Sequence, residues 1–352
     1  MVGTWILYGA NGFSGELIAE EAKRRGMRPI LAGRREEAVR AVAERLGLEH
    51  RIFPLESPEQ IARELEGMRA ILLAAGPFSA TSAPVVEACL RTGTHYLDIT
   101  GEIAVFEDCH ARSAEAKQKG CVLLPGVGFD VVPSDCLAAS LKEALPDART
   151  LELGISSEGT WSKGTAKTMF REVPLGGAVR ENGRIRRVPL AWRTADVPFR
   201  DVTRHAVTIS WGDVSTAYYS TGIPNVQVYM ALPRHVIRGM RLARPVAPIL
   251  RFKAFQRVAA GHIERAIKGP SEEVRRTARC QLWGRVTNAA GRSVEGTLET
   301  PEGYTLTASA AVRCMAKILD GKVAPGTHTP ATAFGSKLIH DFPGCDLRIS
   351  PS

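Results

Sequence analysis

The stretch TWILYGANGFSGELIAEEAKRRGMRPILAGRR, residues 4–35, decides the fold class. It begins with an apolar run, passes through glycines at every third position, and continues into residues rich in Ala, Glu, Lys and Arg. This succession predicts a β-strand, a tight turn and an α-helix. A second apolar burst at 29–34 predicts the next strand.

The same alternation continues through the first 125 residues. Further strand-like bursts, bounded by Gly or Pro, lie at 51–55, 70–77, 95–100 and 121–128. Helix-like segments lie between the bursts, at 14–25, 36–46, 58–66, 82–92 and 105–119. Strands and helices alternating at this length predict an α/β protein with a doubly wound parallel sheet, a Rossmann fold, over residues 1–133. Ligands of such sheets bind at the carboxyl ends of the strands.

The glycines of the first turn indicate what this edge binds. Gly9, Gly12 and Gly15 form a G-x-x-G-x-x-G pattern directly after the first strand. Missing side chains there permit a tight turn, close approach of a pyrophosphate, and close packing of helix on strand. Ser14 adds a hydroxyl that suits a phosphate. A tight turn without a ligand is the alternative, but the position between first strand and first helix favours dinucleotide binding.

The end of the second strand predicts which dinucleotide binds. An acidic residue about twenty positions past the glycines would bond the ribose hydroxyls of NAD, whereas this chain has Gly33, Arg34 and Arg35. Guanidinium groups attract a 2′-phosphate, and Gly33 leaves room beside the adenosine. The alternative is that the arginines are solvated residues opening a helix. We predict NADP(H) as the cofactor, with Arg34 as the main contact to the phosphate.

Length, composition and charge narrow the class of protein. A chain of 352 residues with 44% hydrophobic and 24% charged residues predicts two globular domains. No signal peptide and no run of about 18 apolar residues is recognisable, so we expect a cytoplasmic protein. The cysteines form no CxxC pair and the histidines no HxxxH or HxH pair, so no metal site is expected. Residues 1–133 carry a net charge of −3 (15 basic, 18 acidic), whereas residues 134–352 carry +12 (31 basic, 19 acidic).

Several motifs together resemble one family, the saccharopine dehydrogenase-like oxidoreductases, and within it the branch that includes the trans-acting enoyl reductases. The motifs are YGANGFSG at 8–15, LAGR at 31–34, AAGPFS at 74–79, CLRTGTHYLDITGE at 89–102, PGVGFDVVPSD at 125–135, KGTAKTM at 163–169 and HTPATAFGSKLI at 328–339. They span nearly the full length. The combination is specific, although each motif alone is not.

The resemblance implies a fold for the rest of the chain. It implies a second, α+β domain with a mainly antiparallel sheet at 134–306, and a C-terminal segment of about 307–352 that packs back on the first domain. The sequence agrees in outline, with strand-like segments at 149–157, 205–211, 215–220 and 225–231. A hairpin is expected at 279–300, turning around residues 288–291, and a helix at 307–321.

The resemblance also extends the set of cofactor contacts. Besides the three glycines, Ser14, Gly33, Arg34 and Arg35, it implies contacts from each strand-end loop that carries a family motif. These further residues are Asn11, Phe13, Ala75, Gly76, Pro77, Phe78, Gly126, Gly128 and Phe129. For Phe78 a rigid turn with a core ring is an equal alternative, and glycines 126 and 128 suit close approach of a cofactor.

The activity implied is hydride transfer to or from an enoyl or carbonyl group of a lipid-like substrate. An amino-acid imine, as in saccharopine chemistry, is the second reading, and a non-catalytic NADPH-binding, membrane-associated protein is the third. Tyr96 and Asp98, on one face of a strand end, are the candidate catalytic residues. A buried Asp bonded to backbone amides is the alternative for Asp98. Asp130 and Asp135 are expected to cap the following helix.

The segment 233–268 holds most of the positive charge. Its nine Lys and Arg against one Glu give a net charge of +8. A basic amphipathic helix here would contact a peripheral membrane surface or an acyl-carrier protein, or pack its apolar side on the second domain with a solvated basic face. Nucleic acid is not expected as a partner, because no aromatic platform accompanies the charge. A small-molecule or lipid-linked substrate and a homodimer complete the expected partners.

Overall fold

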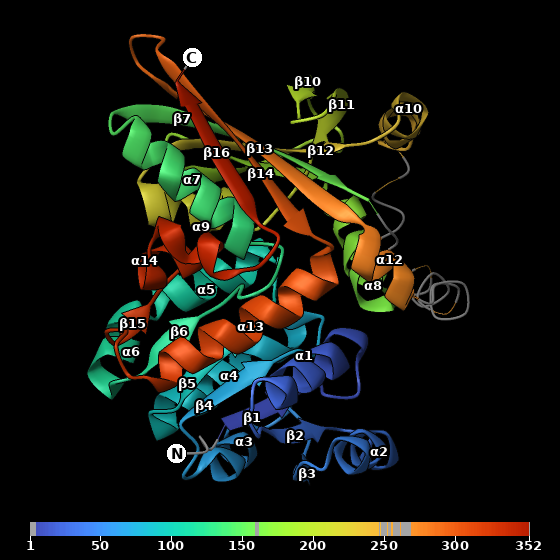
Figure 1. Cartoon of the computed structure of the whole chain (residues 1–352), viewed down its shortest axis with the longest axis vertical. Coiled ribbons are helices and arrows are strands. Elements are labelled where there is room, and N and C mark those ends of the chain that lie inside the picture. Colours follow the sequence, from blue (N-terminus) through green and yellow to red (C-terminus); the bar gives the residue numbers. More distant parts are fainter. Residues whose placement is uncertain are drawn as a thin grey trace. The chain divides into compact units, whose positions relative to one another are not determined.

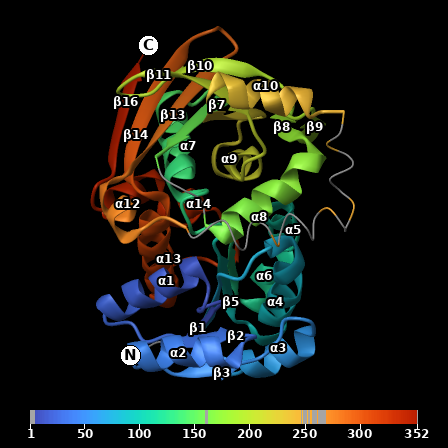
Figure 2. The ribbon, with the colours of Figure 1, turned by 90° about the vertical axis from the view of Figure 1, so that its right-hand side faces the viewer.

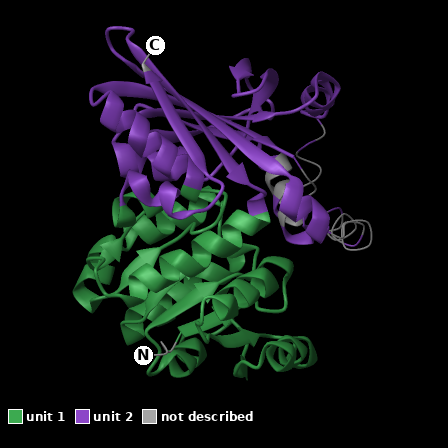
Figure 3. Ribbon diagram, viewed as in Figure 1, with its two compact units in different colours: residues 1–132, 304–334 green, residues 133–303, 335–352 purple. Residues whose placement is uncertain are grey.

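The computed structural model describes residues 5–158, 162–245, 247, 252, 255, 261 and 269–351. The chain forms two compact units (Figure 3). Unit 1 comprises Met1–Val132 and Tyr304–Phe334, and unit 2 comprises Pro133–Gly303 and Gly335–Ser352. Of the basic stretch 233–268, the structure describes 233–245 and four single residues, and the remainder lies outside the described residues.

Unit 1 is built on a seven-stranded sheet in the order β15-β6-β5-β4-β1-β2-β3 (Figure 1). All its pairings are parallel. The chain starts in the middle of this sheet, with β2 on one side of β1 and β4 on the other, so the strand order reverses beside β1. The predicted Rossmann fold is confirmed. Its strands are β1 (Trp5–Tyr8), β2 (Ile30–Gly33), β3 (His50–Ile52), β4 (Ala70–Leu73), β5 (His95–Asp98), β6 (Val122–Leu124) and β15 (Gly326–Thr327).

Helices cover both faces of this sheet (Figure 2). One face carries α1 (Phe13–Arg24), α2 (Glu36–Leu46) and α13 (Gly303–Leu319); the other carries α3 (Pro58–Leu65), α4 (Phe78–Thr92), α5 (Ile103–Ala111) and α6 (Ser113–Lys119). The short helix α14 (Pro330–Phe334) follows later in the chain. Helix α13 rejoins unit 1 from far along the chain, and Arg25 of α1 donates to Ser309 of α13 at 3.4 Å.

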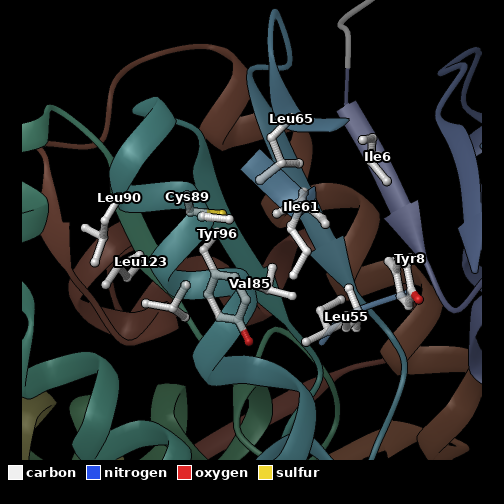
Figure 4. Close-up of a cluster of buried hydrophobic side chains, with 14 of the residues drawn as sticks. Ile6, Tyr8, Leu55, Ile61, Leu65, Val85, Cys89, Leu90, Tyr96 and Leu123 are labelled. Atoms are coloured by element: carbon white, nitrogen blue, oxygen red, sulfur yellow. The ribbon is translucent and has the colours of Figure 1, made fainter. Parts of the chain in front are cut away.

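The core of unit 1 lies between the sheet and helices α3 to α6 (Figure 4). Ile6 and Tyr8 of β1 point to this side because side chains alternate along a strand. They meet Ile61 and Leu65 of α3, and Val85 of α4. Each such buried side chain stabilises the fold by roughly 1.5–3 kcal/mol. The core holds the strand ends in place, and with them the loops that follow.

Unit 2 is built on a nine-stranded mixed sheet whose main path is β10-β11-β12-β7-β13-β14-β16, with β8 and β9 branching from β12. Among the described strands of this unit, only β7 and β12 pair in parallel, and the remaining pairs are antiparallel. The strands are β7 (Ala148–Ser157), β8 (Gly177–Glu181), β9 (Arg184–Val188), β10 (Thr194–Pro198), β11 (Thr203–Thr208), β12 (Asn225–Ala231), β13 (Arg279–Asn288), β14 (Ser293–Pro301) and β16 (Asp346–Pro351). The expected second α+β fold with a mainly antiparallel sheet is confirmed.

The described helices of unit 2 include α7 (Val132–Ala144), α8 (Lys163–Glu172), η1 (Val173–Leu175), α9 (Asp213–Thr221), α10 (Arg234–Leu242), α12 (Glu272–Thr277) and η3 (Ser336–Asp341). Helix α7 lies close to the sheet because glycines face each other beneath it. Gly284 of β13 pairs with Gly296 of β14. A Cβ at Gly284 would lie 2.6 Å from Leu141, and one at Gly296 would lie 3.1 Å from Leu137. Any side chain on this pair would push α7 away.

One expected strand is a helix. Residues 215–220 have strand-like composition, yet they lie in α9, which starts at Asp213 and ends at Gly222 in the left-handed conformation. The aromatic rings explain the difference, because Tyr218 stacks on the guanidinium of Arg180 at 4.4 Å. Helical spacing also buries Val214 and Ala217 together.

The C-terminal segment divides between the units. The sequence places all of residues 307–352 on the first domain, but only residues up to Phe334 belong to unit 1. Residues 335–352 belong to unit 2, because β16 adds to the edge of its sheet by pairing with β14 over six residue pairs. Because its backbone pairs with β14, this last segment does not join the first domain as expected.

Candidate functional site

The turn between β1 and α1 excludes side chains at two of its three glycines. Gly9 has φ of +88°, and a Cβ there would lie 2.8 Å from the carbonyl carbon of Ala74. A Cβ at Gly15 would lie 2.1 Å from the carbonyl oxygen of Gly9. Both glycines are therefore required by packing within the chain. They bring the amino end of α1 directly against the end of β1.

Gly12, the third glycine, is less tightly enclosed than the other two. It is the N-cap of α1, which has no side-chain cap, and a Cβ there would approach only the Gly9 oxygen, at 3.3 Å. In the described part of the chain, the Ser14 hydroxyl forms no hydrogen bond. A helix start carries a positive dipole end and N–H donors without intrahelical partners. The start of α1 therefore fits an anionic group such as a pyrophosphate.

The start of α4, the helix that follows β4, is occupied by the chain itself. The Glu102 carboxylate accepts hydrogen bonds from the backbone N–H groups of Phe78 at 2.7 Å and Ser79 at 2.9 Å. An anion binds there, but it belongs to the protein. Of these two helix starts, α1 is the one whose N-cap residue makes no side-chain cap hydrogen bond, although Glu16 lies in its first turn.

Arg34 and Arg35 lie at the end of β2, beside the glycine turn. Both are exposed, and across residues 5–158 and the other described ranges neither forms a hydrogen bond or ion pair. Burial raises the pKa of Tyr8 to about 12, and the charge of Arg34 acts in the opposite direction. This electrostatic coupling places Arg34 near the carboxyl end of β1. The two guanidinium groups are therefore available to a phosphate on this edge.

Gly33 has a role that the sequence does not indicate. A Cβ there would lie 2.8 Å from Val39 and 3.1 Å from the side-chain oxygen of Asn11. The missing side chain makes room for Asn11, from the glycine turn, and for helix α2. The space that we expected beside an adenosine is therefore at least partly taken by protein atoms.

The loop from β4 to α4 packs on itself. Thr81 donates to the Ala75 carbonyl at 2.8 Å, and the Phe78 ring lies 3.5 Å from where a Cβ of Gly76 would be. The Gly76–Pro77 peptide is cis. Phe78 is half-buried and packs against the core of unit 1. The loop stands at the same edge as the glycine turn, with Phe78 anchored in the core.

Asp98 and Tyr96 form a sealed, hydrogen-bonded group at the end of β5. Both side chains are fully buried, and the Tyr96 hydroxyl donates to Asp98 at 2.6 Å. Asp98 also accepts from the N–H groups of Thr100 at 3.0 Å and Gly126 at 2.8 Å. Burial raises the pKa of Asp98 to about 6 and that of Tyr96 well above its usual value. The arrangement joins β5 to the loop after β6, which is the alternative foreseen for Asp98; its catalytic role stays a prediction.

The glycines of the β6–α7 loop accommodate protein groups. Gly126 has φ of +76°, and a Cβ there would lie 2.7 Å from the Phe106 ring. A Cβ at Gly128 would lie 3.2 Å from Thr307 of α13, whose hydroxyl accepts from the Phe129 N–H at 3.0 Å. Close approach of a cofactor is therefore not needed to explain these two glycines.

Asp130 does not have the role of helix cap that the sequence predicts. Its carboxyl lies against Gly101, where a Cβ would be 2.9 Å from an Asp130 oxygen. It is half-buried, and burial alone raises its pKa to about 6. Within the described residues it forms no hydrogen bond or ion pair, so it does not cap α7. A carboxyl that is reachable, unpaired and near neutral pKa can exchange a proton. Asp135, the other expected cap, is buried in the first turn of α7.

Helix α13 adds residues to this edge that no local motif indicates. Tyr304 packs edge-on against Phe13 of the glycine turn, with ring centroids 5.0 Å apart. Thr307, one turn later, holds Phe129. Both come from a segment about 300 residues after the glycine turn in the chain. Periodicity predicts such a helix but not the loops that it contacts.

Comparisons with known proteins agree with this geometry. Residues 5–124 match the family model of the saccharopine dehydrogenase NADP binding domain. The trans-acting enoyl reductase of Mycobacterium leprae is 36% identical over 158 residues, 42% of this chain and 37% of that protein. That of Mycobacterium tuberculosis strain H37Rv is 36% identical over 141 residues, 37% of this chain and 33% of that protein. The matched region thus spans about a third of either relative.

A solved structure is similar over the whole chain. The apo saccharopine dehydrogenase (L-Glu forming) of Saccharomyces cerevisiae has a TM-score of 0.67 and 10% identity, covering 99% of this chain and 100% of that chain. At this identity the likeness shows the fold alone.

The sheet order and the glycine turn define the class as a dinucleotide-binding protein of the Rossmann type. Residues 5–124, about a third of the chain, are similar to the saccharopine dehydrogenase NADP binding domain. The matched domain is named for binding NADP, and the residues of unit 1 fit NADP(H). The helix start without a side-chain cap suits the pyrophosphate, and the unpaired arginines at the end of β2 suit a 2′-phosphate.

Proposed function

We propose that the protein is an NADP-dependent oxidoreductase that transfers a hydride to or from an enoyl or carbonyl group of a lipid-like substrate. One observation carries the cofactor part of this proposal. The helix start at Gly12 and the unpaired guanidinium of Arg34 stand on the same edge of one sheet, beside the point where strand order reverses. Dinucleotides lie across that point in Rossmann folds.

The residues at the carboxyl edge of this sheet bind different parts of the cofactor or exchange a proton. Backbone donors at the start of α1, with Ser14, bind the pyrophosphate, and Arg34 binds the 2′-phosphate. When bound, NADP(H) supplies or accepts the hydride. Asp130 follows β6, on the β4–β6 half of the sheet, which in this fold receives the second nucleotide. We assign Asp130 the proton exchange and Asp98 the positioning of the loop that carries it.

The substrate class rests on the named relatives. The curated proteins that match the N-terminal region are trans-acting enoyl reductases, which supports an enoyl or carbonyl acceptor. The likeness to a saccharopine dehydrogenase supports an amino-acid imine as the second candidate, but only through the fold. An imine substrate that carries carboxylates would require several arginines directed at them.

The experiment compares NADPH with NADH and then tests turnover. Titration of the full chain, followed by the quenching of its tryptophan fluorescence, should show clearly tighter binding of NADPH. Oxidation of NADPH is then measured with α,β-unsaturated acyl thioesters, ketones and imines of amino acids. Equal affinity for both cofactors would overturn the NADP assignment. Tight binding without turnover on any of the three classes would instead favour a non-catalytic NADPH-binding protein.

A further inference from the structure

Helix α10 of unit 2 presents large apolar side chains to solvent. Its inner side is anchored, because Ile237 is buried and Met240 packs on the same cluster. Its outer side carries Leu242, which is 81% exposed, and Val236, which is 39% exposed. A single exposed Leu is ordinary on a protein surface, so the surroundings decide whether this one has a role.

The exposed apolar residues are concentrated in one part of the chain. Of seven large apolar side chains that the structure shows as exposed, four lie between residues 236 and 255. Besides the two on α10 they are Phe252 and Phe255, at 65% and 51% exposure. A surface cavity of about 220 Å³ adjoins the end of α10, lined by Leu175, Leu190 and Arg244 among others. The exposed apolar side chains thus gather in one segment of the chain, and those of α10 lie on a helix that the structure describes throughout.

Positive charge surrounds these apolar groups without compensation. Residues 231–245 contain four Arg and no acidic residue. Arg241 and Arg244 bond the Ala191 carbonyl, which fastens α10 to the loop before β10. Arg234 and Arg238 are exposed and, in the part of the chain that the structure describes, form no ion pair or hydrogen bond. Helix α10 therefore carries two exposed arginines that no ion pair neutralises among the described residues.

We propose that α10 docks unit 2 on an anionic membrane surface. Leu242 and Val236 enter the boundary between headgroups and acyl chains, while Arg234 and Arg238 bind lipid phosphates. Arginine suits this place because its stem lies along apolar surface while its head stays in the polar layer. An anchored helix with apolar and basic residues on its outer side has the character of an interfacial helix.

A lipid surface matches this patch better than an acidic protein does. Protein partners bury their anchors in shaped pockets on both sides, over about 800 Å² per partner. Helix α10 is only nine residues long, and its exposed apolar side chains project singly. A bilayer needs no matching shape and accepts separate apolar side chains from several elements. In the described ranges no helix has the length and apolar character to cross a membrane, so any contact through α10 is peripheral. This proposal does not depend on the catalytic one.

The test is co-sedimentation of the full chain with vesicles. One set contains phosphatidylcholine alone and the other contains phosphatidylcholine with phosphatidylglycerol, each at low and high salt. Leu242→Ser and Arg238→Glu probe the patch. Val202→Ser, at a site 47% exposed, and Arg63→Glu, an exposed arginine of α3, are matched controls elsewhere on the surface. Thermal unfolding of every variant shows that it folds.

The wild type should sediment with anionic vesicles at low salt, and not with neutral ones. Arg238→Glu changes the charge by two units and should lower the partition coefficient about 25-fold, at about fivefold per unit charge. Leu242→Ser should lower it roughly tenfold, and the controls should leave it unchanged. The proposal is overturned if anionic vesicles do not retain the wild type, or if Arg63→Glu weakens binding as much as Arg238→Glu. Retention unaffected by Leu242→Ser, or binding to an acidic acyl-carrier protein but not to vesicles, would also overturn it.

Discussion

Replacement of Arg34 by Ala tests how the protein selects its cofactor. Arg34 is exposed and unpaired among the described residues, so removing its side chain should cost no folding stability. A charge-assisted hydrogen bond contributes about 1.5–3 kcal/mol. Because the site is exposed, the lower end applies, which corresponds to roughly tenfold in affinity. Arg34→Ala should therefore weaken NADPH binding roughly tenfold and leave NADH binding nearly unchanged.

The assay is fluorescence titration with both cofactors, performed at two salt concentrations because the interaction is between exposed charges. Arg40→Ala is the matched control. Arg40 lies six residues later, within α2, and pairs with Glu36 at 3.7 Å, so its replacement removes the same charge from a nearby part of the sequence. If Arg34→Ala and Arg40→Ala weaken NADPH binding equally, general electrostatics explains the preference, and the assignment of Arg34 to the 2′-phosphate is wrong.

Three further predictions concern the same edge of the sheet. Asp130→Asn should remove the limb of the pH–rate profile near pH 6, because the wild-type carboxyl is the proton donor below its pKa of about 6; an unchanged profile would exclude Asp130 from proton transfer. Asp98→Asn should lower the free energy of unfolding by about 1–3 kcal/mol in urea titrations, since the amide nitrogen that replaces one carboxylate oxygen cannot accept the hydrogen bond of the Tyr96 hydroxyl. Folding raises the pKa of Asp98 to about 6, so the protonated carboxyl contributes its full stabilisation at pH values below its usual pKa. This stabilisation is lost as pH rises through 6. The loss in free energy of unfolding caused by Asp98→Asn should therefore be larger at pH 4 than at pH 7. Gly15→Ala should unfold unit 1, whereas Gly12→Ala should fold and bind NADPH more weakly; equal stability of the two in thermal unfolding would contradict the turn geometry.

Some local features of the chain were predictable from the sequence with correct bounds. Residues 36–46 were expected as a helix and form α2 with those bounds, because Gly47 ends it in the left-handed conformation. The hairpin around residues 288–291 joins β13 to β14 as expected. In both cases the determining residues are neighbours in sequence.

Features that depend on distant partners were not predictable. Strand β16 adopts its place by pairing with β14, about fifty residues earlier, and nothing within residues 346–351 indicates that partner. Likewise, Gly126 and Gly128 looked like glycines that admit a cofactor, but Phe106 and Thr307 fill the space in front of them. A missing side chain shows that something approaches closely, and only the fold shows what it is.

The sequence alone determined the alternation of strands and helices, the glycine turn, and the presence of Arg34, where NAD-binding folds carry an acidic residue, at the end of the second strand. These follow from periodicity and spacing, which neighbouring residues encode. The tertiary structure decided which carboxyl is sealed and which is reachable. Asp98 is bonded on all sides, whereas Asp130 stands half-buried and unpaired among the described residues, since burial is a property of the packed fold.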